Sequence, residues 1–185
     1  MKTSQRLLVT VTATLILLLA FVPAAFAGKV HFNSIIFNIG SSLDFSTVLL
    51  GLVGNETFEI NVTATASVTA ICEDPGGNQA PGQNPAFVEI GQSVTAMTNF
   101  GGRAAVLIEV PDPTSPGNEP SPTPEEAGCP EGYSEVVDIV DGSTNWTAAR
   151  IVVVDGDGII QVDRTFACTT FFKDGVTTRV TCKLV

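Results

Sequence analysis

The chain has 185 residues, of which 44 % are hydrophobic and 15 % are charged. It carries 19 Asp and Glu against nine Lys and Arg, a formal net charge of −10. This apolar content predicts a globular domain rather than a disordered acidic tail. The excess negative charge repels phosphate backbones and anionic lipids, which argues against nucleic acid partners and against electrostatic docking on membranes.

The first 27 residues have the three parts of an export signal. Lys2 and Arg6 form a basic start, residues 15–22 form an apolar segment, and residues 25–27 (Ala-Phe-Ala) match the A-x-A cleavage pattern. The apolar segment is shorter than the ~20 residues that a membrane helix needs, so we expect cleavage rather than a retained anchor. The expected product is a single secreted domain, residues 28–185, with no integral membrane span.

Residues 28–185 have the pattern of β-strands nearly throughout. The clearest run, 57–72, alternates apolar residues with polar, mostly hydroxyl-bearing ones, which is typical of a half-buried strand. Sixteen residues is long for one strand of a sandwich, so Ala64 and Ala66 are expected to mark a bend or a point of close packing. The other predicted strands are 30–39, 47–52, 87–99, 103–110, 134–140, 149–155, 159–172 and 177–185.

Turn signals separate these strands, among them Asp-Gly-Asp-Gly at 155–158 and Asp-Gly at 174–175. No segment has convincing helical periodicity. The pattern predicts an all-β fold, an immunoglobulin-like antiparallel β-sandwich of one domain. Residues 111–130 hold seven of the eleven Pro and are expected to form a long surface loop, because the 55 residues after them would make a small separate core.

The four Cys of an exported chain are expected to form two disulfides. If the turn before the C-terminus has three residues, 174–176, then Cys168 and Cys182 stand directly opposite each other in a hairpin, close enough to bond. A two-residue Asp-Gly turn would shift this register by one. By elimination Cys72 would pair with Cys129 and tie the two Pro-rich stretches together.

The Pro- and Gly-rich stretch 71–85 is the most individual passage of the chain. Its glycines are typical of an anion nest, but it has no Lys, and its two acidic residues would repel phosphate. A constrained turn held by a disulfide is the preferred interpretation. The alternative is a ligand-binding loop, whose candidate contacts are Asn78, Gln79, Gln83, Asn84 and Trp146.

Other chemistries find little support. Residues 152–163 resemble a calcium loop, but with Asp157 at its fifth position and Gly158 at its sixth, the first and twelfth positions are Val153 and Arg164. A calcium loop has carboxylates at both, so a hairpin turn is preferred. His31 is the only histidine, which argues against a Ser-His-Asp enzyme. A carboxylate pair for glycoside hydrolysis stays open, with the strand residues Glu59, Glu89, Glu109 and Asp163 as candidates. We expect no catalytic residue, no metal and no cofactor.

Three stretches resemble a group of secreted β-sandwich proteins of bacteria and some fungi that have no established activity. They are 51–85 with its Cys-x-x-Pro-Gly-Gly-Asn loop, the segment from Cys129-Pro130 to Trp146, and 165–182. Glu73 and Asp74 depart from the more neutral pair expected in that group. The resemblance implies export, a β fold and four paired Cys, and it implies no site.

The sequence therefore predicts a secreted, non-catalytic structural or interaction module of the cell surface or extracellular matrix. Its expected partners are cell-surface or matrix components. A glycan- or ligand-binding module that uses the 71–85 loop and Trp146 is the first alternative. A carboxylate-based hydrolase is the second.

Overall fold

The computed structural model describes residues 30–39, 42–113 and 122–185. The predicted export signal, residues 1–27, lies outside these ranges. The described elements are, in chain order, β1 (His31–Ile39), β2 (Ser42–Leu50), β3 (Thr57–Val68), β4 (Ala70–Glu73), β5 (Gln79–Pro81), β6 (Ala86–Met97), β7 (Ala104–Pro111), α2 (Pro124–Ala127), β8 (Glu135–Ile139), β9 (Asn145–Asp155), β10 (Ile160–Lys173) and β11 (Val176–Leu184).

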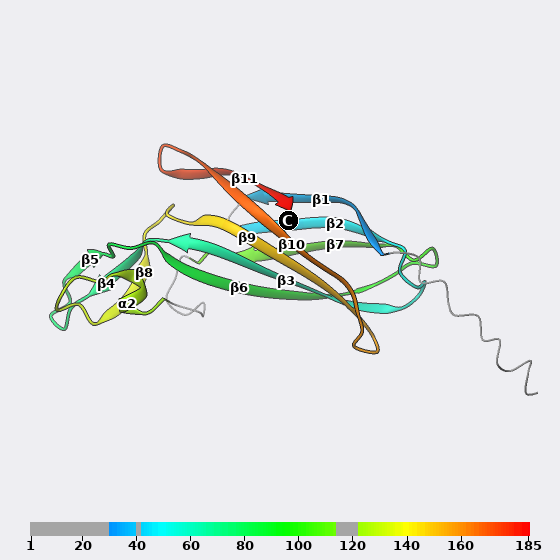
Figure 1. Cartoon of the computed structure of the whole chain (residues 1–185), viewed down its shortest axis with the longest axis horizontal. Coiled ribbons are helices and arrows are strands. Elements are labelled where there is room, and N and C mark those ends of the chain that lie inside the picture. The colour runs from blue at the N-terminus through cyan, green and yellow to red at the C-terminus, as the bar shows by residue number, and fades with distance from the viewer. Residues whose placement is uncertain (1–29, 40–41, 114–121) are drawn as a thin grey trace, which may run out of the picture.

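The strands form three antiparallel sheets. A three-stranded sheet, β1-β2-β7, packs against a five-stranded sheet, β11-β10-β9-β3-β6, while the third sheet, β5-β4-β8, lies with α2 at one end of the molecule (Figure 1). The fold is therefore all-β, with antiparallel sheets in a sandwich arrangement, as the sequence predicts. No helix within the described ranges has the length and apolar character needed to span a bilayer.

The core follows from the period-two pattern of the strands. In β3 every second residue from Phe58 to Val68 is buried, while the residues between them reach the surface. The second layer of the core comes from β2 and β7, which contribute Leu43, Phe45, Leu49, Val106, Ile108 and Val110. Burying one such side chain contributes about 1.5–3 kcal/mol. Because all the large apolar side chains of β3 lie on one face, the fold is most stable with that face inside.

The long alternating run 57–72 is divided between two sheets. β3 ends at Val68, and β4 begins two residues later in the third sheet. At the break, the Thr69 N–H donates to Ser143 Oγ (3.0 Å), and the Thr69 carbonyl accepts from the Val140 N–H (2.8 Å). The expected close packing at Ala66 is also present, because Ala66 lies opposite the bulky Trp146 next to a register shift between β3 and β9.

The C-terminal hairpin pairs Cys168 with Cys182, as predicted, although the predicted turn is wrong. The turn has two residues, Asp174 and Gly175, both with positive φ, and Lys173 faces Val176. A bulge between the Phe171 and Phe172 pairings then restores the register. The two Cys are therefore directly opposite, with Cα atoms 4.0 Å apart, and they form a disulfide. The bulge compensates for the short turn, and the residue numbers alone did not predict this bulge.

The third sheet and α2 form what we call the end unit, residues 70–85 and 122–139. The second predicted disulfide, Cys72–Cys129, joins its two segments across 57 residues of sequence. α2 is a helical turn inside the stretch expected to be a loop. It has a capping box, in which Glu126 N–H donates to Thr123 Oγ1 (3.3 Å) and Thr123 N–H donates to Glu126 Oε2 (2.8 Å). Its Ala127 is fully buried.

Candidate functional site

The 71–85 stretch is a β-hairpin organised by one carboxylate. Asp74 Oδ1 accepts hydrogen bonds from the backbone N–H groups of Gly76 (2.8 Å) and Asn78 (2.9 Å). Asp74 Oδ2 accepts from the Asn78 side-chain amide (2.8 Å). These hydrogen bonds, that from the Asn78 side chain first, lower the pKa of the Asp74 carboxyl. Gly77 completes the turn at φ +81°, a conformation that L side chains rarely adopt.

The strands on either side of this turn, β4 and β5, pair with each other. Their first pair beyond the turn is Glu73 with Gln79, and the Gln79 side-chain amide donates to Glu73 Oε2 (2.8 Å). Sequence reasoning treated the acidic residues only as a barrier to phosphate. In the structure, both acidic side chains hold the turn together.

The end of the stretch is fastened to α2. The backbone N–H groups of Gln83 and Asn84 donate to the carbonyls of Gly128 and Ala127, both at 3.1 Å. A Cβ on Gly82 would overlap the Ala127 carbonyl, so a side chain at this position would push α2 away. Of the four predicted amide contacts, Asn78 and Gln79 thus use their side chains inside the hairpin, while the exposed Gln83 and Asn84 bind α2 through their backbones.

Trp146, the fifth predicted contact, lies elsewhere. Its side chain belongs to the sandwich core and is only 2 % exposed. It therefore offers no aromatic platform to a ligand beside the 71–85 hairpin. The structure brings the four amide residues together in the end unit and leaves Trp146 out.

The outward side of the five-stranded sheet is a broad polar surface, which we call the polar face. Two neighbouring rows of paired residues define its centre. One row runs Ser93, Asn61, Val152, Asp163, and the other runs Gly91, Thr63, Arg150, Thr165, each from β6 through β3 and β9 to β10. On β3 and β6 the side chains of these rows are short, which leaves backbone, amide and hydroxyl groups accessible there.

Gly91 makes a shallow depression in the polar face. The depression has a volume of about 330 Å³ and is lined by residues of β3 and β6, among them Asn61, Thr63 and Ser93. No atom lies within 4 Å of the place where a Cβ on Gly91 would stand, and the residue has no positive φ. A glycine inside a strand weakens it by roughly 0.5–1 kcal/mol relative to Ala, so the fold itself gives no reason for this residue.

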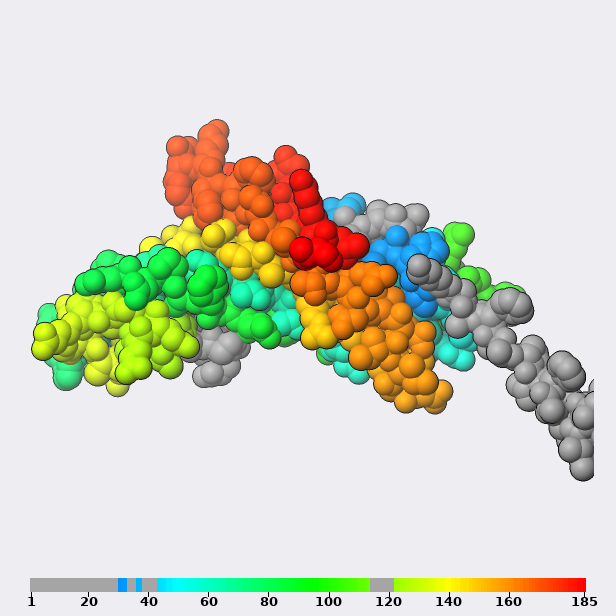
Figure 2. Space-filling view, viewed as in Figure 1, coloured from blue at the N-terminus to red at the C-terminus, as the bar shows by residue number. Residues whose placement is uncertain are grey.

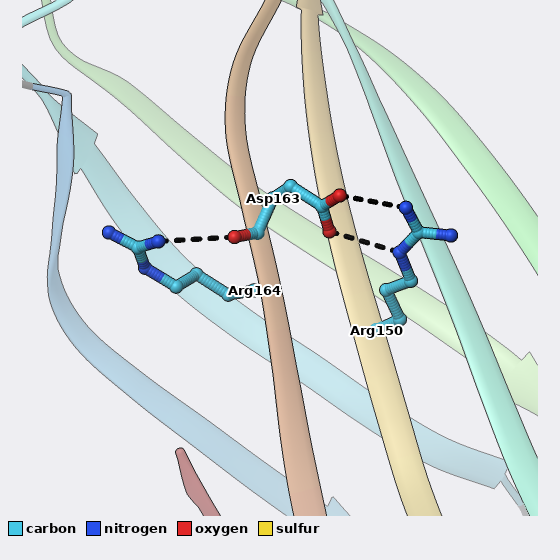
Figure 3. Close-up of polar contacts among 3 residues, drawn as sticks. All are labelled: Arg150, Asp163 and Arg164. Carbon is cyan, nitrogen blue, oxygen red and sulfur yellow. Dashed lines mark hydrogen bonds and ion pairs between the residues drawn. The ribbon is translucent and has the colours of Figure 1, made fainter. Parts of the chain in front are cut away.

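A bidentate ion pair lies beside the depression (Figure 3). Arg150 donates from Nε to Asp163 Oδ1 (2.9 Å) and from Nη2 to Asp163 Oδ2 (2.7 Å). This contact raises the pKa of Arg150 and lowers the pKa of Asp163. Arg164 projects from the other side of β10 and donates to the Asp163 carbonyl (3.1 Å). Both side chains of the ion pair are exposed to solvent, so the pair fixes charge positions more than it adds stability.

The candidate carboxylates are spread over the sandwich. Glu109 lies on the three-stranded sheet, whereas Glu59, Glu89 and Asp163 lie on the polar face. Glu59 and Glu89 are separated by six residues along β3, roughly 20 Å at ~3.3 Å per residue. A glycosidase needs two carboxyl groups within about 10 Å, so Glu59 and Glu89 are too far apart to act as such a pair. His31 lies on β1, in the other sheet.

The Asp-Gly-Asp-Gly stretch forms the predicted turn between β9 and β10. Asp155 Oδ1 accepts from the N–H groups of Asp157 (3.0 Å) and Ile159 (2.8 Å), and Oδ2 accepts from the Gln161 side chain (2.6 Å). The hydrogen bond from Ile159 is the main cause of the lowered pKa of Asp155. Among the described residues, no group of three or more His, Cys, Asp and Glu side chains is arranged to hold a metal ion.

No family model matches the chain, and no curated protein matches it significantly. The resemblance to secreted β-sandwich proteins therefore stays a prediction. The residues that sequence reasoning missed are Asp74, Gly91 and the Arg150–Asp163 pair. Asp74 had a signal, since an Asp before Pro-Gly-Gly-Asn is typical of a side-chain-stabilised turn. The other features depend on the register of β3, β6, β9 and β10, which the sequence does not specify.

Proposed function

We propose that this chain is a secreted, non-catalytic interaction module with an immunoglobulin-like sandwich, and that it binds a cell-surface or matrix component through the polar face. The proposal rests chiefly on Gly91. This residue weakens its strand, no close contact requires it, and it opens a depression between accessible hydroxyl and amide groups. A bound partner that approaches the backbone of β6 accounts for a glycine at this position.

The carboxyl groups with shifted pKa values support a non-catalytic role. Those of Asp74, Glu126, Asp155 and Asp163 are all lowered by hydrogen bonds. A general acid needs the opposite, a raised pKa that keeps its proton near neutral pH. These carboxylates stabilise turns, a helix cap and an ion pair instead.

A glycan is the second candidate partner, now placed on the polar face rather than on the 71–85 hairpin. Asn61, Thr63 and Ser93 carry amide and hydroxyl groups beside the depression, and these groups exchange hydrogen bonds with sugar hydroxyls. The hairpin amides of Asn78 and Gln79 already bond to Asp74 and Glu73. They are therefore poorer candidates for ligand contact.

The test uses the mature chain and cell-surface material of the source organism, fractionated into protein and polysaccharide. Gly91→Tyr fills the depression, and Ala105→Tyr places the same side chain on an exposed position of β7, in the other sheet. We expect Gly91→Tyr to weaken binding at least about tenfold and Ala105→Tyr to leave it unchanged. Equal binding by both variants would remove the polar face from the proposal, and turnover of a polysaccharide would show that the chain is an enzyme.

A further inference from the structure

The C-terminal hairpin leaves the five-stranded sheet at its disulfide. Ala167 is the last β10 residue paired with β9, and the next residue is Cys168, bonded to Cys182. Beyond this point β10 and β11 pair only with each other in the five-stranded sheet, and the hairpin stands out from the body of the molecule (Figure 2). The hairpin is also fastened to the residues at the start of β9, because Thr170 Oγ1 donates to the Trp146 carbonyl (3.0 Å) and Thr177 Oγ1 donates to the Thr144 carbonyl (3.2 Å). A two-stranded hairpin alone is marginally stable in water, so the disulfide and these hydrogen bonds together keep this segment ordered.

One face of the hairpin is basic and apolar. From the register of β10 and β11, the side chains of Lys173, Arg179 and Lys183 share the outward face with Phe171 and Val176. All five are exposed, and the Arg179 guanidinium lies 5.8 Å from the centroid of the Phe171 ring. These three cations are among only seven Lys and Arg after residue 27, and Asp174 is the single acidic residue of the hairpin.

The end unit has the opposite character. Residues 70–85 and 122–139 contain seven Asp and Glu and not one Lys or Arg. Within the described ranges, no salt bridge neutralises the hairpin cations or the acidic residues of the end unit. The turn of the hairpin and the end unit lie toward the same end of the long axis (Figure 1).

We propose that the chain forms a dimer in which the basic face of the hairpin, residues 168–183, docks on the acidic end unit of a second copy, and that the contact is made twice. Two patches at the same end of a molecule allow a twofold arrangement in which each hairpin meets the other copy's end unit. The dimer covers Phe171 and Val176 and pairs charges that are unpaired in the monomer. The basic face lies on the same side of β10 as Asp163, but the proposal does not rest on the depression at Gly91.

A second copy fits this face better than an anionic membrane. The net charge of −10 makes approach to a negatively charged surface unfavourable for the whole molecule. Between two copies the same repulsion is screened beyond ~8 Å at physiological salt, whereas the opposite charges of hairpin and end unit come into contact. The disulfide also holds the hairpin ordered before docking, which reduces the entropy lost on association.

The test is a set of charge reversals, measured by analytical ultracentrifugation of the oxidised mature chain between about 1 µM and 1 mM. The hairpin variant is K173E/R179E/K183E. The end-unit variant is E125K/E131K/E135K, which changes exposed residues and spares the structural Asp74, Glu73 and Glu126. Each variant alone should dimerise at least about tenfold more weakly than the wild type, because every reversed contact becomes repulsive and is made twice.

Mixing the two variants is the decisive experiment. An equimolar mixture of the two variants should form a heterodimer, because the reversed hairpin then faces the reversed end unit and the two native patches face each other. The control E56K/E59K/D157K makes the same change of charge as the end-unit variant, at exposed positions outside the end unit and the hairpin, and it should not weaken dimerisation. Circular dichroism and intact disulfides establish that each variant is folded.

Several results would overturn the proposal. They are a wild-type chain that is monomeric at every concentration, a dimer unaffected by either reversal, and a mixture that does not associate. Binding of the monomer to phosphatidylglycerol vesicles through the hairpin, without dimer formation, would assign the basic face to lipid instead. If Gly91→Tyr loses binding to cell-surface material but still dimerises, the two proposals concern different surfaces, and each can fail without the other.

Discussion

The carboxylate of Asp74 receives hydrogen bonds from both the backbone and the side chain of Asn78, four residues further along the chain. This pair closes the turn between β4 and β5, which the Cys72–Cys129 disulfide holds against α2. The most individual stretch of the sequence is thus explained by its internal bonding. The side chains of Asn78 and Gln79 bond to acidic neighbours, which leaves Gln83 and Asn84 as the stretch's exposed amide side chains outside this bonding.

The first prediction concerns the dependence of this turn on pH. Because the folded-state pKa of Asp74 is lowered, its contribution to stability is present above the unfolded value, near 3.8, and is lost as pH falls through the lower folded value. We expect amide exchange of Gly76 and Asn78, corrected for intrinsic rates, to accelerate below about pH 4. In Asp74→Ala, exchange should be fast at neutral pH as well. Protection that persists unchanged in this variant would show that Asp74 does not organise the turn.

A second prediction compares two glycines in different conformations. Gly77 has φ +81°, so Gly77→Val should destabilise the protein by about 1–3 kcal/mol. Gly91 lies in open space inside β6 without positive φ, so Gly91→Val should leave stability unchanged or raise it by up to about 1 kcal/mol. Urea unfolding of both variants measures the difference. Equal destabilisation by the two would contradict the assignment of Gly91 to binding.

The strands could be predicted well because they bury one face. In β3, alternation from Phe58 to Val68 leaves one way to place the apolar side chains inside, so both the strand and its orientation follow from the sequence. The break at Thr69 could not be predicted, because the alternation continues into β4. It depends on Ser143 and Val140, which are distant in sequence. α2 did have a local signal, Thr-Pro-Glu-Glu-Ala-Gly, which combines a capping box with a C-terminal Gly.

The candidate site was harder to predict than the fold. Asn61, Thr63, Gly91 and Ser93 are unremarkable as separate residues, and they meet only because β3 and β6 pair in one register. The position of Trp146 was difficult to predict for a different reason. A single Trp in an exported chain suggests a surface contact, yet its large apolar side chain is more stable in the core opposite Ala66.

A third prediction follows from the position of Trp146. At 2 % exposure its fluorescence should be emitted at short wavelength and resist quenching by acrylamide, with or without a glycan. Trp146→Ala should destabilise the protein by about 3–5 kcal/mol. Phe87→Ala removes an aromatic side chain that is 67 % exposed and should change stability by no more than about 0.5 kcal/mol. Strong quenching by a bound ligand would place Trp146 at a binding site after all.

The last prediction separates the two disulfides. Peptide mapping without reduction should yield Cys72–Cys129 and Cys168–Cys182, the pairs whose Cα atoms are 5.7 Å and 4.0 Å apart. The first pair spans 57 residues and the second 14, so the loss of unfolded-state entropy corresponds to about 4 and about 3 kcal/mol, respectively. C72S/C129S should therefore unfold at a lower urea concentration than C168S/C182S.

The two double variants should also differ in where they loosen. Hydrogen exchange should rise in residues 70–85 and 122–139 for C72S/C129S, because this disulfide joins the two segments of the end unit. For C168S/C182S it should rise in residues 168–182, where β10 and β11 have no other partner in their sheet, while β3 stays protected. If C168S/C182S instead exposes β3, the hairpin is part of the cooperative core. It would then not be an ordered arm that the disulfide holds ready for a second copy.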